Sequence, residues 1–337
     1  MEEKKKILFG VLNWGLGHAT RSWELINSYV LAGHEVVLAS DGVAAKFLST
    51  EFPFLKIVSL PSYKIKYGKG AGVLQMLFNA LRTKRAVAAE KKFLDDYLSK
   101  NEFDLIISDN RYGLFSDSVK SVIITHQLNI KVPFGNKVVN WQNHKWLNRF
   151  AEVWVPDTNA ELSGELTHPI PHEINKPVKE IGLLSRFKNL NQTKGQEIDV
   201  LVIVSGPEPQ KTILVNKLQQ IFKELQYITV LYTGEVNLRK TIRTGNLTIK
   251  SHAETNEFYK DLLTAKFVIG RSGYSSLMDY SVMKKSFITI PTPGQYEQLY
   301  LAKMLSKKGI PLLLQSELSK EKIEKAIQKA RLYRSTK

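Results

Sequence analysis

The feature that most limits the possible fold is a pattern of short apolar segments alternating with helical segments, which occurs twice along the chain. The apolar segments are predicted strands at residues 7–12, 35–39, 55–60, 104–108, 121–125 and 152–155, and again at 199–204, 228–232, 247–250, 267–269 and 287–290. Apolar strands separated by helices are typical of a parallel sheet that is covered on both faces. The sequence therefore predicts an α/β fold made of two Rossmann-like, doubly wound domains.

A region rich in Pro, Gly, Asn and Lys, residues 161–196, separates the two halves of the pattern and is interpreted as the interdomain region. We place an N-terminal domain at 1–180, a linker at 181–197 and a C-terminal domain at 198–320. A helix at 321–337 ends the chain, and its packing back on the N-terminal domain is one arrangement we consider. Ligands of doubly wound folds bind beyond the carboxyl ends of the strands. We therefore expect two domains that face each other across a ligand-binding cleft.

The formal net charge of +16 is unevenly distributed. Residues 1–180 contain 23 Lys and Arg and 19 Asp and Glu, whereas residues 181–337 contain 25 and 13. Such a surface suits an anionic metabolite, an anionic lipid or nucleic acid, or it is simply solvated. No nucleic-acid-binding motif is visible and aromatic residues are not interleaved with the cations, so we expect no nucleic-acid partner.

Other classes of protein are disfavoured by what the sequence lacks. There is no cysteine, which excludes disulfides and thiolate metal sites. No apolar run reaches eighteen residues, and the first lysines lead directly into a strand without the apolar core of a signal peptide. The histidines lack metal-ligand spacing and no Asp-x-Asp motif is present. We therefore expect a cytoplasmic protein without a bound metal.

The segment from Phe267 to Asp279 predicts an anion-binding site. An apolar strand is followed by a turn of small residues and then by a helix, whose first N–H groups and dipole attract an anion. Arg271 adds positive charge at this turn, although a surface salt bridge is the alternative role. A diphosphate at the turn and a ribose at the Asp279 carboxylate together describe a sugar nucleotide. The candidates in this segment are Arg271, Ser272, Gly273, Tyr274, Ser275, Ser276 and Asp279.

Two other loops of the second half are assigned to the same ligand. Ser205 and Gly206 follow a strand and can offer backbone N–H groups to a phosphate, or they form a rigid structural turn with Pro207. Glu297 and Gln298 follow a Pro-x-Pro-Gly turn, and their side chains suit the hydroxyl groups of a sugar. An ordinary helix start is the alternative for these two residues.

The loop after the first strand carries the strongest candidate for a general base. Gly15 and Gly17 permit a close approach of the backbone to a ligand. A helix follows, with Arg21 near its start. His18 lies at the tip of the turn, and the ordinary pKa of an imidazole is close to neutrality. A histidine that merely holds the turn is the alternative.

Polar residues also follow two later strands of the first half. The carboxyl ends of parallel strands meet at one edge of the sheet, so these residues are expected near His18. We assign Asp109 a catalytic role beside His18, with capping and loop structure as the alternative. The residues assigned to a loop contacting the acceptor or the diphosphate are Gly15, Gly17, Arg21, His126 and Gln127.

The stretch from Ser62 to Ala89 contains six Lys or Arg and no Asp or Glu. An apolar segment at 73–81 lies between the cations. An apolar stripe flanked by cations can lie on an anionic bilayer. A helix that is buried in its own domain and has a basic rim is the alternative.

These motifs resemble the GT-B glycosyltransferases, most closely family 28, which includes the peptidoglycan N-acetylglucosaminyltransferase. Gly15-Leu16-Gly17-His18 is similar to the family's Gly-rich loop ending in His, and Arg271-Ser272-Gly273 to its Arg-Ser-Gly turn. Asp279 stands where the family carries the acidic ribose ligand, usually Glu, and Glu297-Gln298 resembles its sugar-binding segment. The loop at 205–209 and the residues Ala19-Thr20-Arg21 depart from the family pattern, which indicates a divergent branch.

The resemblance implies an enzyme that transfers a hexose or N-acetylhexosamine from a UDP-sugar, with inversion and without a metal. The UDP-sugar is a co-substrate, and no cofactor is expected. A lipid-linked sugar, a lipid and a small metabolite stay open as acceptors, the first two with peripheral attachment to the inner face of the membrane. A sugar-nucleotide 2-epimerase on the same fold and a non-enzymatic basic module for anionic membrane or nucleic acid are the other interpretations.

Overall fold

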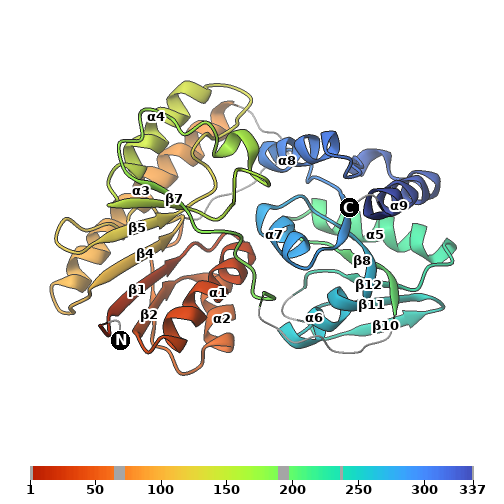
Figure 1. Ribbon diagram of the computed structural model, residues 1–337, viewed down its shortest axis with the longest axis horizontal. Coiled ribbons are helices and arrows are strands. Elements are labelled where there is room, and N and C mark those ends of the chain that lie inside the picture. Colours follow the sequence, from red (N-terminus) through yellow and green to blue (C-terminus); the bar gives the residue numbers. More distant parts are fainter. Residues whose placement is uncertain (1–2, 64–72, 189–196, 236–237, 336–337) are drawn as a thin grey trace. The chain divides into compact units, whose positions relative to one another are not determined.

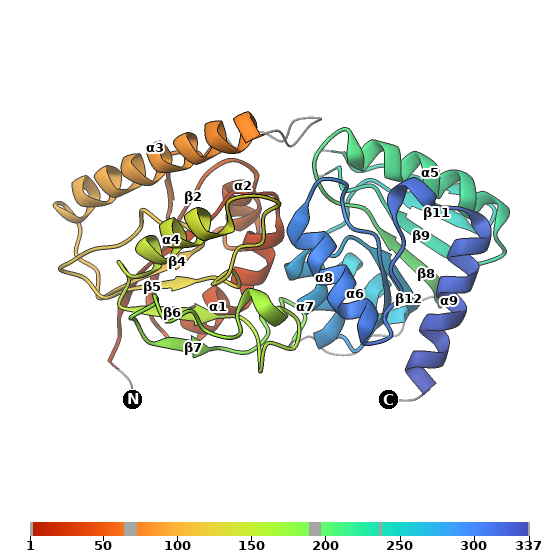
Figure 2. The same ribbon diagram turned by 90° about the horizontal axis from the view of Figure 1, so that it is seen from above.

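The computed structural model describes residues 3–63, 73–188, 197–235 and 238–335 and divides into two compact units, Met1–Arg186 and Phe187–Lys337 (Figure 1). Each unit has a mainly parallel sheet with helices packed against it, seen from a second direction in Figure 2. The predicted α/β class with two doubly wound domains is thus confirmed. We describe the units one at a time.

Unit 1 is built on a seven-stranded sheet in the order β3-β2-β1-β4-β5-β6-β7, in which all neighbours are parallel. Its strands are β1 Lys6–Val11, β2 Glu35–Ser40, β3 Ile57–Ser59, β4 Leu105–Asp109, β5 Ser121–Ile124, β6 Glu152–Val155 and β7 Val178–Glu180. The short β7 pairs with β6 although it lies in the region that the sequence assigned between the domains. Pro, Gly and Asn in that region mark its turns, while its three-residue strand is too short to show a period.

The helices of unit 1 are α1 Gly17–Leu31, α2 Gly42–Glu51, α3 Val73–Leu98 and α4 Asn136–Leu147, with a 3-10 turn at Gly164–Leu166. On β1, Leu8 faces a core cluster that contains Leu94 of α3, while its neighbours Ile7 and Phe9 are equally buried. Successive strand residues point to opposite faces, so both faces of the sheet are covered. This explains why the strands are continuously apolar instead of alternating.

The stretch considered for membrane contact coincides in part with α3. Residues 64–72, with three of its lysines, and the side chains of 73–80 lie outside what the structure describes. In the described part, Ala86 and Val87 are buried in a core cluster with Tyr112 and Leu147. This part of the helix packs against its own unit. Within the described residues, no helix combines the length and apolar character that crossing a bilayer requires.

Unit 2 has a six-stranded sheet in the order β10-β11-β9-β8-β12-β13. Its strands are β8 Ile198–Ile203, β9 Thr229–Tyr232, β10 Thr241–Thr244, β11 Leu247–Lys250, β12 Ala265–Gly270 and β13 Ser286–Thr289. Only the β10–β11 pair is antiparallel. The strand β10 was not predicted, because all four of its residues are exposed and it carries no apolar pattern.

The helices of unit 2 are α5 Gln210–Glu224, α6 Thr255–Thr264, α7 Tyr274–Val282, α8 Tyr296–Lys307 and α9 Lys320–Ser335, with a 3-10 turn at Gln315–Glu317. The last helix, α9, contributes Ile323, Ile327 and Ala330 to the core of this unit, where they join Leu214 and Leu218 of α5. The buried face of the C-terminal helix therefore belongs to unit 2.

Candidate functional site

The candidate base in unit 1 lies beside β1, the strand at which the strand order of the sheet reverses. β1 is flanked by β2 on one side and β4 on the other, and Val11 at the end of β1 pairs with Asp109 at the end of β4. Connections leaving such a central strand run to opposite sides of the sheet, which opens a crevice for ligands at the carboxyl ends. The sequence placed His18 and Asp109 at this edge, and the structure brings them into contact.

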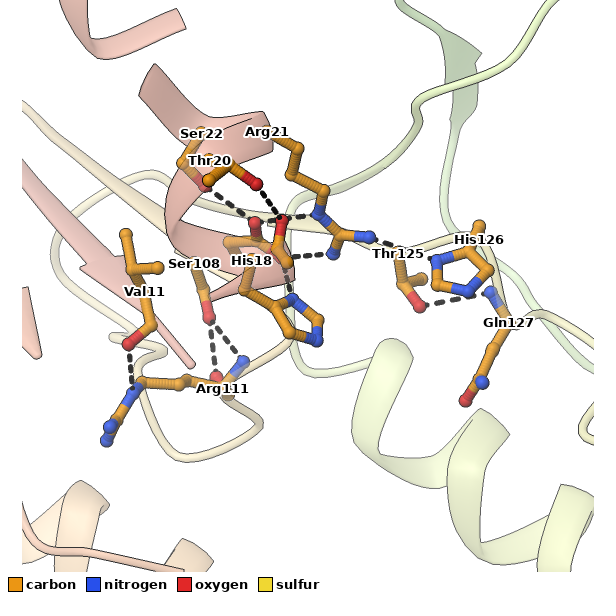
Figure 3. Close-up of polar contacts among 12 residues, drawn as sticks. Val11, His18, Thr20, Arg21, Ser22, Ser108, Arg111, Thr125, His126 and Gln127 are labelled. Carbon is orange, nitrogen blue, oxygen red and sulfur yellow. Dashed lines mark hydrogen bonds and ion pairs between the residues drawn. The ribbon is translucent and has the colours of Figure 1, made fainter. Parts of the chain in front are cut away.

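The loop after β1 delivers His18 to this point. Gly15 adopts the left-handed conformation with φ of 72°, which a residue with a Cβ rarely adopts. The helix α1 then begins at Gly17. His18, Arg21 and Ser22 follow at spacings of three and four, so they share one helix face directed at the end of β4. Figure 3 shows these side chains converging from α1.

His18 and Asp109 form a hydrogen bond, with 2.9 Å between Nδ1 of the imidazole and Oδ1 of the carboxylate. An ionised carboxylate can only accept, so the imidazole carries its proton on Nδ1 and keeps the lone pair on Nε2. Burial and the Arg21 charge lower the pKa of His18 below its ordinary 6.5, although Asp109 acts in the opposite direction. The ring is therefore neutral at neutral pH, with Nε2 able to accept a proton.

Asp109 is fully buried, and its carboxylate is saturated with donors. Besides His18, it receives Ser22 Oγ at 2.6 Å and Arg21 Nε at 2.9 Å, and a second Arg21 nitrogen completes a bidentate pair. Burial alone would raise the pKa of Asp109, but the Arg21 and His18 interactions hold it well below its usual range. Asp109 thus orients His18, and its oxygens are occupied by protein donors.

Arg21 was assigned to a loop that contacts the ligand, whereas in the structure its side chain contacts other residues of the protein. Its side chain is 2% exposed, and its guanidinium binds Asp109 and, through Nη1 at 3.1 Å, His126 Nδ1. The arginine therefore joins the ends of α1, β4 and β5 (Figure 3). Beside it, the Gln127 N–H donates to Thr125 Oγ1, which fixes the start of the loop after β5.

Asn110, the residue after Asp109 in the polar cluster that follows β4, has an unusual backbone conformation. It has a φ of 58°, in the left-handed region, and is 6% exposed. Its Oδ1 is buried without a hydrogen-bond partner. A strained residue with an unpaired acceptor beside the candidate base is typical of a functional site.

In unit 2 the predicted ligand loops meet at the corresponding edge, since Ile203 of β8 pairs with Gly270 of β12. Ser205 and Gly206 follow β8, and Gly206 has a φ of 112° that favours glycine. The helix α7 begins at Tyr274 after Gly273, and its start has no side-chain cap. Backbone N–H groups in the first turn of a helix have no intrahelical partner, so this end suits an anion.

Arg271 is not free to neutralise a phosphate in this structure. It is 1% exposed and donates to four backbone carbonyls, those of Ser205, Gln210, Ile290 and Pro291, at 3.1 to 3.3 Å. Burial lowers the pKa of Arg271 to about 10, so it keeps its charge at neutral pH. The arginine ties the ends of three segments together. Among the described residues it forms no salt bridge, and its guanidinium is not at the surface.

Some of the remaining predicted residues of unit 2 hold its loops, others are partly exposed, and Gln298 does both. Ser272 Oγ donates to the carbonyl of Gln298 at 2.8 Å, and Gln298 Oε1 accepts the N–H of Thr292 at 2.9 Å, so both fix the start of α8. Tyr274 is buried. The partly exposed residues are Gly273, Ser275, Ser276, Asp279, Glu297 and Gln298.

Thr292 is a candidate that sequence reasoning missed. Its side chain is 2% exposed, and its Oγ1 has no hydrogen-bond partner. A Cβ built on Gly206 would lie 3.4 Å from this oxygen, so the hydroxyl faces the loop after β8. An unpaired buried hydroxyl costs about 1 to 3 kcal/mol, and a ligand oxygen at this point would offset the cost. Its position between two prolines indicated only a turn.

Neither unit shows a group of three or more His, Asp or Glu that could hold a metal ion among the described residues. Asp109 and Arg271 are paired with protein donors and acceptors.

The model of glycosyl transferase family 1 matches residues 5–139 and 186–330, which is most of the chain. The chain belongs to glycosyl transferase family 1. It is a glycosyltransferase, and the resemblance to GT-B enzymes that its motifs carry is confirmed. No curated protein sequence matches the chain.

Solved structures with the same fold span nearly the whole enzyme. The glycotransferase of kitacinnamycin matches over 99% of this chain and 95% of its own, at 13% identity and a TM-score of 0.66. Arabidopsis thaliana UGT89C1 complexed with UDP matches over 99% and 92%, at 14% identity and a TM-score of 0.66. Acinetobacter baumannii MurG, a family 28 enzyme, matches over 99% and 95%, at 13% identity and a TM-score of 0.58. At these identities the likeness establishes the fold.

Proposed function

We propose that this glycosyltransferase moves a hexose or N-acetylhexosamine from a UDP-sugar to an acceptor hydroxyl, with inversion at the anomeric carbon and without a metal. The observation that carries the proposal is the 2.9 Å bond from His18 Nδ1 to the buried Asp109, which leaves Nε2 as a base. Support for the donor comes from the similar Arabidopsis thaliana UGT89C1 structures, which are complexed with UDP and with UDP-L-rhamnose.

In the proposed reaction, His18 Nε2 removes the proton of the acceptor hydroxyl as its oxygen attacks the anomeric carbon. The bond between that carbon and the diphosphate oxygen breaks, its electron pair leaves with UDP, and the product is a glycoside of opposite anomeric configuration. The imidazolium that forms is stabilised by Asp109. General-base catalysis of this kind contributes about 10²- to 10⁴-fold.

The donor site in this proposal is the edge of unit 2. The start of α7 and the backbone at Ser205 and Gly206 would receive the diphosphate, and Thr292 Oγ1 would donate to one of its oxygens. Asp279 would accept hydrogen bonds from the ribose, with Glu297 and Gln298 near the sugar. The diphosphate charge that develops on leaving would be stabilised by oriented backbone dipoles.

The proposal is tested by thermal shift and UDP release with a panel of UDP-hexoses and UDP-N-acetylhexosamines, each with and without hydroxyl acceptors. We expect stabilisation by UDP, UDP release that requires an acceptor, and equal rates after treatment with EDTA. Conversion of UDP-N-acetylglucosamine without an acceptor would instead identify an epimerase. Absence of any response to nucleoside diphosphates would overturn the proposal.

Replacing Asp279 by alanine is expected to weaken UDP binding about tenfold, or about 1.4 kcal/mol. The reason is the loss of the carboxylate that would accept hydrogen bonds from the ribose. Isothermal titration calorimetry with UDP measures this loss. Inorganic diphosphate, which lacks the ribose and the base, is the control ligand and separates the ribose contact from the phosphate contact. Equal affinity of the variant for UDP would remove Asp279 from the site.

Replacing Thr292 by valine is expected to act in opposite directions on stability and on binding. The free energy of unfolding should rise or stay constant, because an unpaired buried hydroxyl is removed. The affinity for UDP should fall by about 0.5 to 1.5 kcal/mol, the net value of one hydrogen bond. Urea unfolding and calorimetry measure the two quantities.

The matched control is Thr289→Val. Thr289 is 1% exposed, and its Oγ1 donates to the carbonyl of Pro311 at 3.1 Å. We expect this variant to lose about 1 kcal/mol of stability and to keep its affinity for UDP. A Thr292→Val protein that loses stability as Thr289→Val does, and binds UDP normally, would show that Thr292 is structural.

A further inference from the structure

Two imidazoles lie beside one buried guanidinium in unit 1. His18 reaches it through Asp109, and His126 contacts it directly, with 3.1 Å between His126 Nδ1 and Arg21 Nη1 (Figure 3). His126 is 6% exposed and comes from the loop after β5. The two rings therefore belong to different segments but share a single ionic network.

The chemistry of arginine decides the proton position on His126. A guanidinium has only N–H donors and stays charged in proteins, so it cannot accept a hydrogen bond. His126 Nδ1 must therefore be the acceptor in the 3.1 Å contact, and the proton of the neutral ring lies on Nε2. With the proton on Nδ1, two donors would face each other at hydrogen-bond distance.

The chemistry of the carboxylate decides the opposite arrangement on His18. Asp109 accepts the Nδ1–H of His18, so the lone pair of that ring lies on Nε2. Arg21 maintains this arrangement, because its bidentate contact with Asp109 balances a carboxylate that is completely buried. One arginine thus acts on both rings, on one directly and on the other through Asp109.

We propose that Arg21 is a positioning residue that sets opposite tautomers on two neighbouring histidines, making His18 Nε2 a proton acceptor and His126 Nε2 a proton donor. His18 is then the base of the pair, whereas the neutral ring of His126 carries its proton on Nε2. The assignment of His18 as base rests on the proposed function, whereas the two tautomers follow from the contacts alone.

The charged and titratable groups that face His18 come from three elements: Arg21 on α1, Asp109 on β4 and His126 after β5. Arg21 and His126 lower the pKa of His18, and Asp109 raises it. Removing the arginine charge therefore raises the pKa of His18. Because the neutral ring is the base, the acidic limb of the activity profile would move to higher pH.

The test uses the full chain labelled with ¹⁵N-histidine, which contains seven histidines, and assigns the two rings from His18→Gln and His126→Gln variants. Long-range ¹H–¹⁵N spectra distinguish protonated from unprotonated ring nitrogens. At neutral pH we expect the proton of His18 on Nδ1 and the proton of His126 on Nε2. The same tautomer on both rings would overturn the proposal, whatever the activity of the protein.

Two substitutions separate the charge of Arg21 from its geometry. Arg21→Gln should shift the His18 titration to higher pH. Arg21→Lys keeps the charge beside Asp109 but cannot donate to both partners in the planar geometry of arginine, so His126 should become a mixture of tautomers while the His18 titration stays near the wild-type value. Arg149→Gln, an exposed position on unit 1, is the control and should change neither spectrum.

The outcomes also separate this proposal from the proposed function. If no UDP-sugar is turned over but both tautomers and the titration shift are observed, the proposed proton arrangement is confirmed and the proposed transfer reaction is contradicted. If transfer occurs and Arg21→Lys leaves His126 unchanged, the positioning role of Arg21 is wrong. If Arg21→Gln does not fold, the wild-type spectra and Arg21→Lys still decide the assignment.

Discussion

Replacing His18 by alanine is expected to lower the rate of glycosyl transfer by about 10²- to 10⁴-fold, the usual contribution of a general base. His18 is partly accessible, with 12% of its side chain exposed, and its free Nε2 is the only part of the His18–Asp109 pair left to receive a proton. Affinity for UDP should stay within about twofold, because the base acts on the acceptor. Steady-state UDP release and calorimetry measure the two effects.

His172→Ala is the matched control for this experiment. His172 belongs to the same unit, its side chain is 93% exposed, and its Nδ1 lies 3.6 Å from Oε2 of Glu173. We expect wild-type rates from this variant. Retention of normal transfer by His18→Ala, with a normal control, would mean that the base is a different group.

The pH dependence of the same reaction follows from the pKa of His18. Burial and Arg21 depress this pKa below the ordinary 6.5 of an imidazole. The base form therefore predominates at neutral pH, and activity falls as the pH drops through the depressed pKa. His18→Ala should lose this acidic limb together with most of the rate.

The fold could be predicted from the sequence because parallel strands that are buried on both faces must be continuously apolar. The segments around β1, β4, β8 and β12 satisfied this condition and were found within a few residues. The exposed β10 and the three-residue β7 could not be found in this way. They pair with the sheet through backbone hydrogen bonds, which leave no pattern in the side chains.

The sequence indicated the loops of the candidate site but not the contacts between their side chains. Ligand loops lie at the carboxyl ends of strands in any doubly wound fold, so His18, Asp109 and Gly206 could be located from the strand pattern. The contact between His18 and Asp109 joins residues that are 91 positions apart. It depends on β4 lying next to β1, and a single sequence does not specify the strand order.

Arg21 and Arg271 make contacts that the sequence could not indicate. A cation beside a helix start and a Gly-rich turn was expected to meet a phosphate. Both guanidiniums are instead buried, one on a carboxylate and one on four carbonyls. Arginine has five donors, so it can join several loop ends at once, and this use requires no sequence pattern beyond the residue itself.

Replacing Asp109 by asparagine is expected to reduce both stability and activity, by about 3 to 5 kcal/mol and about 10²- to 10⁴-fold. The variant keeps the shape of the side chain but leaves Arg21 as a buried cation without a counter-charge. It also places an amide N–H2 among four donors, which allows the imidazole of His18 to adopt the other tautomer. Urea unfolding and UDP release measure the two losses.

The loss of stability in Asp109→Asn is expected to depend on pH. The pKa of Asp109 is depressed in the folded chain, so the carboxylate stabilises the fold above its unfolded pKa of about 4 and loses this contribution as the pH falls toward the folded value. The difference in stability between wild type and Asp109→Asn should therefore be full at neutral pH and shrink in acid. A difference that does not depend on pH would contradict the buried ion pair.

A control must separate lost stability from lost chemistry, and Glu90→Gln provides it. Glu90 is a second fully buried carboxylate of unit 1, bound to Arg111 and Tyr63 and not to His18. It should lose stability and keep the rate per folded molecule. The double variant His18→Ala/Asp109→Asn should be no slower than His18→Ala alone, because Asp109 acts on the reaction only through the ring of His18. An additive loss would give Asp109 a role of its own in the transfer.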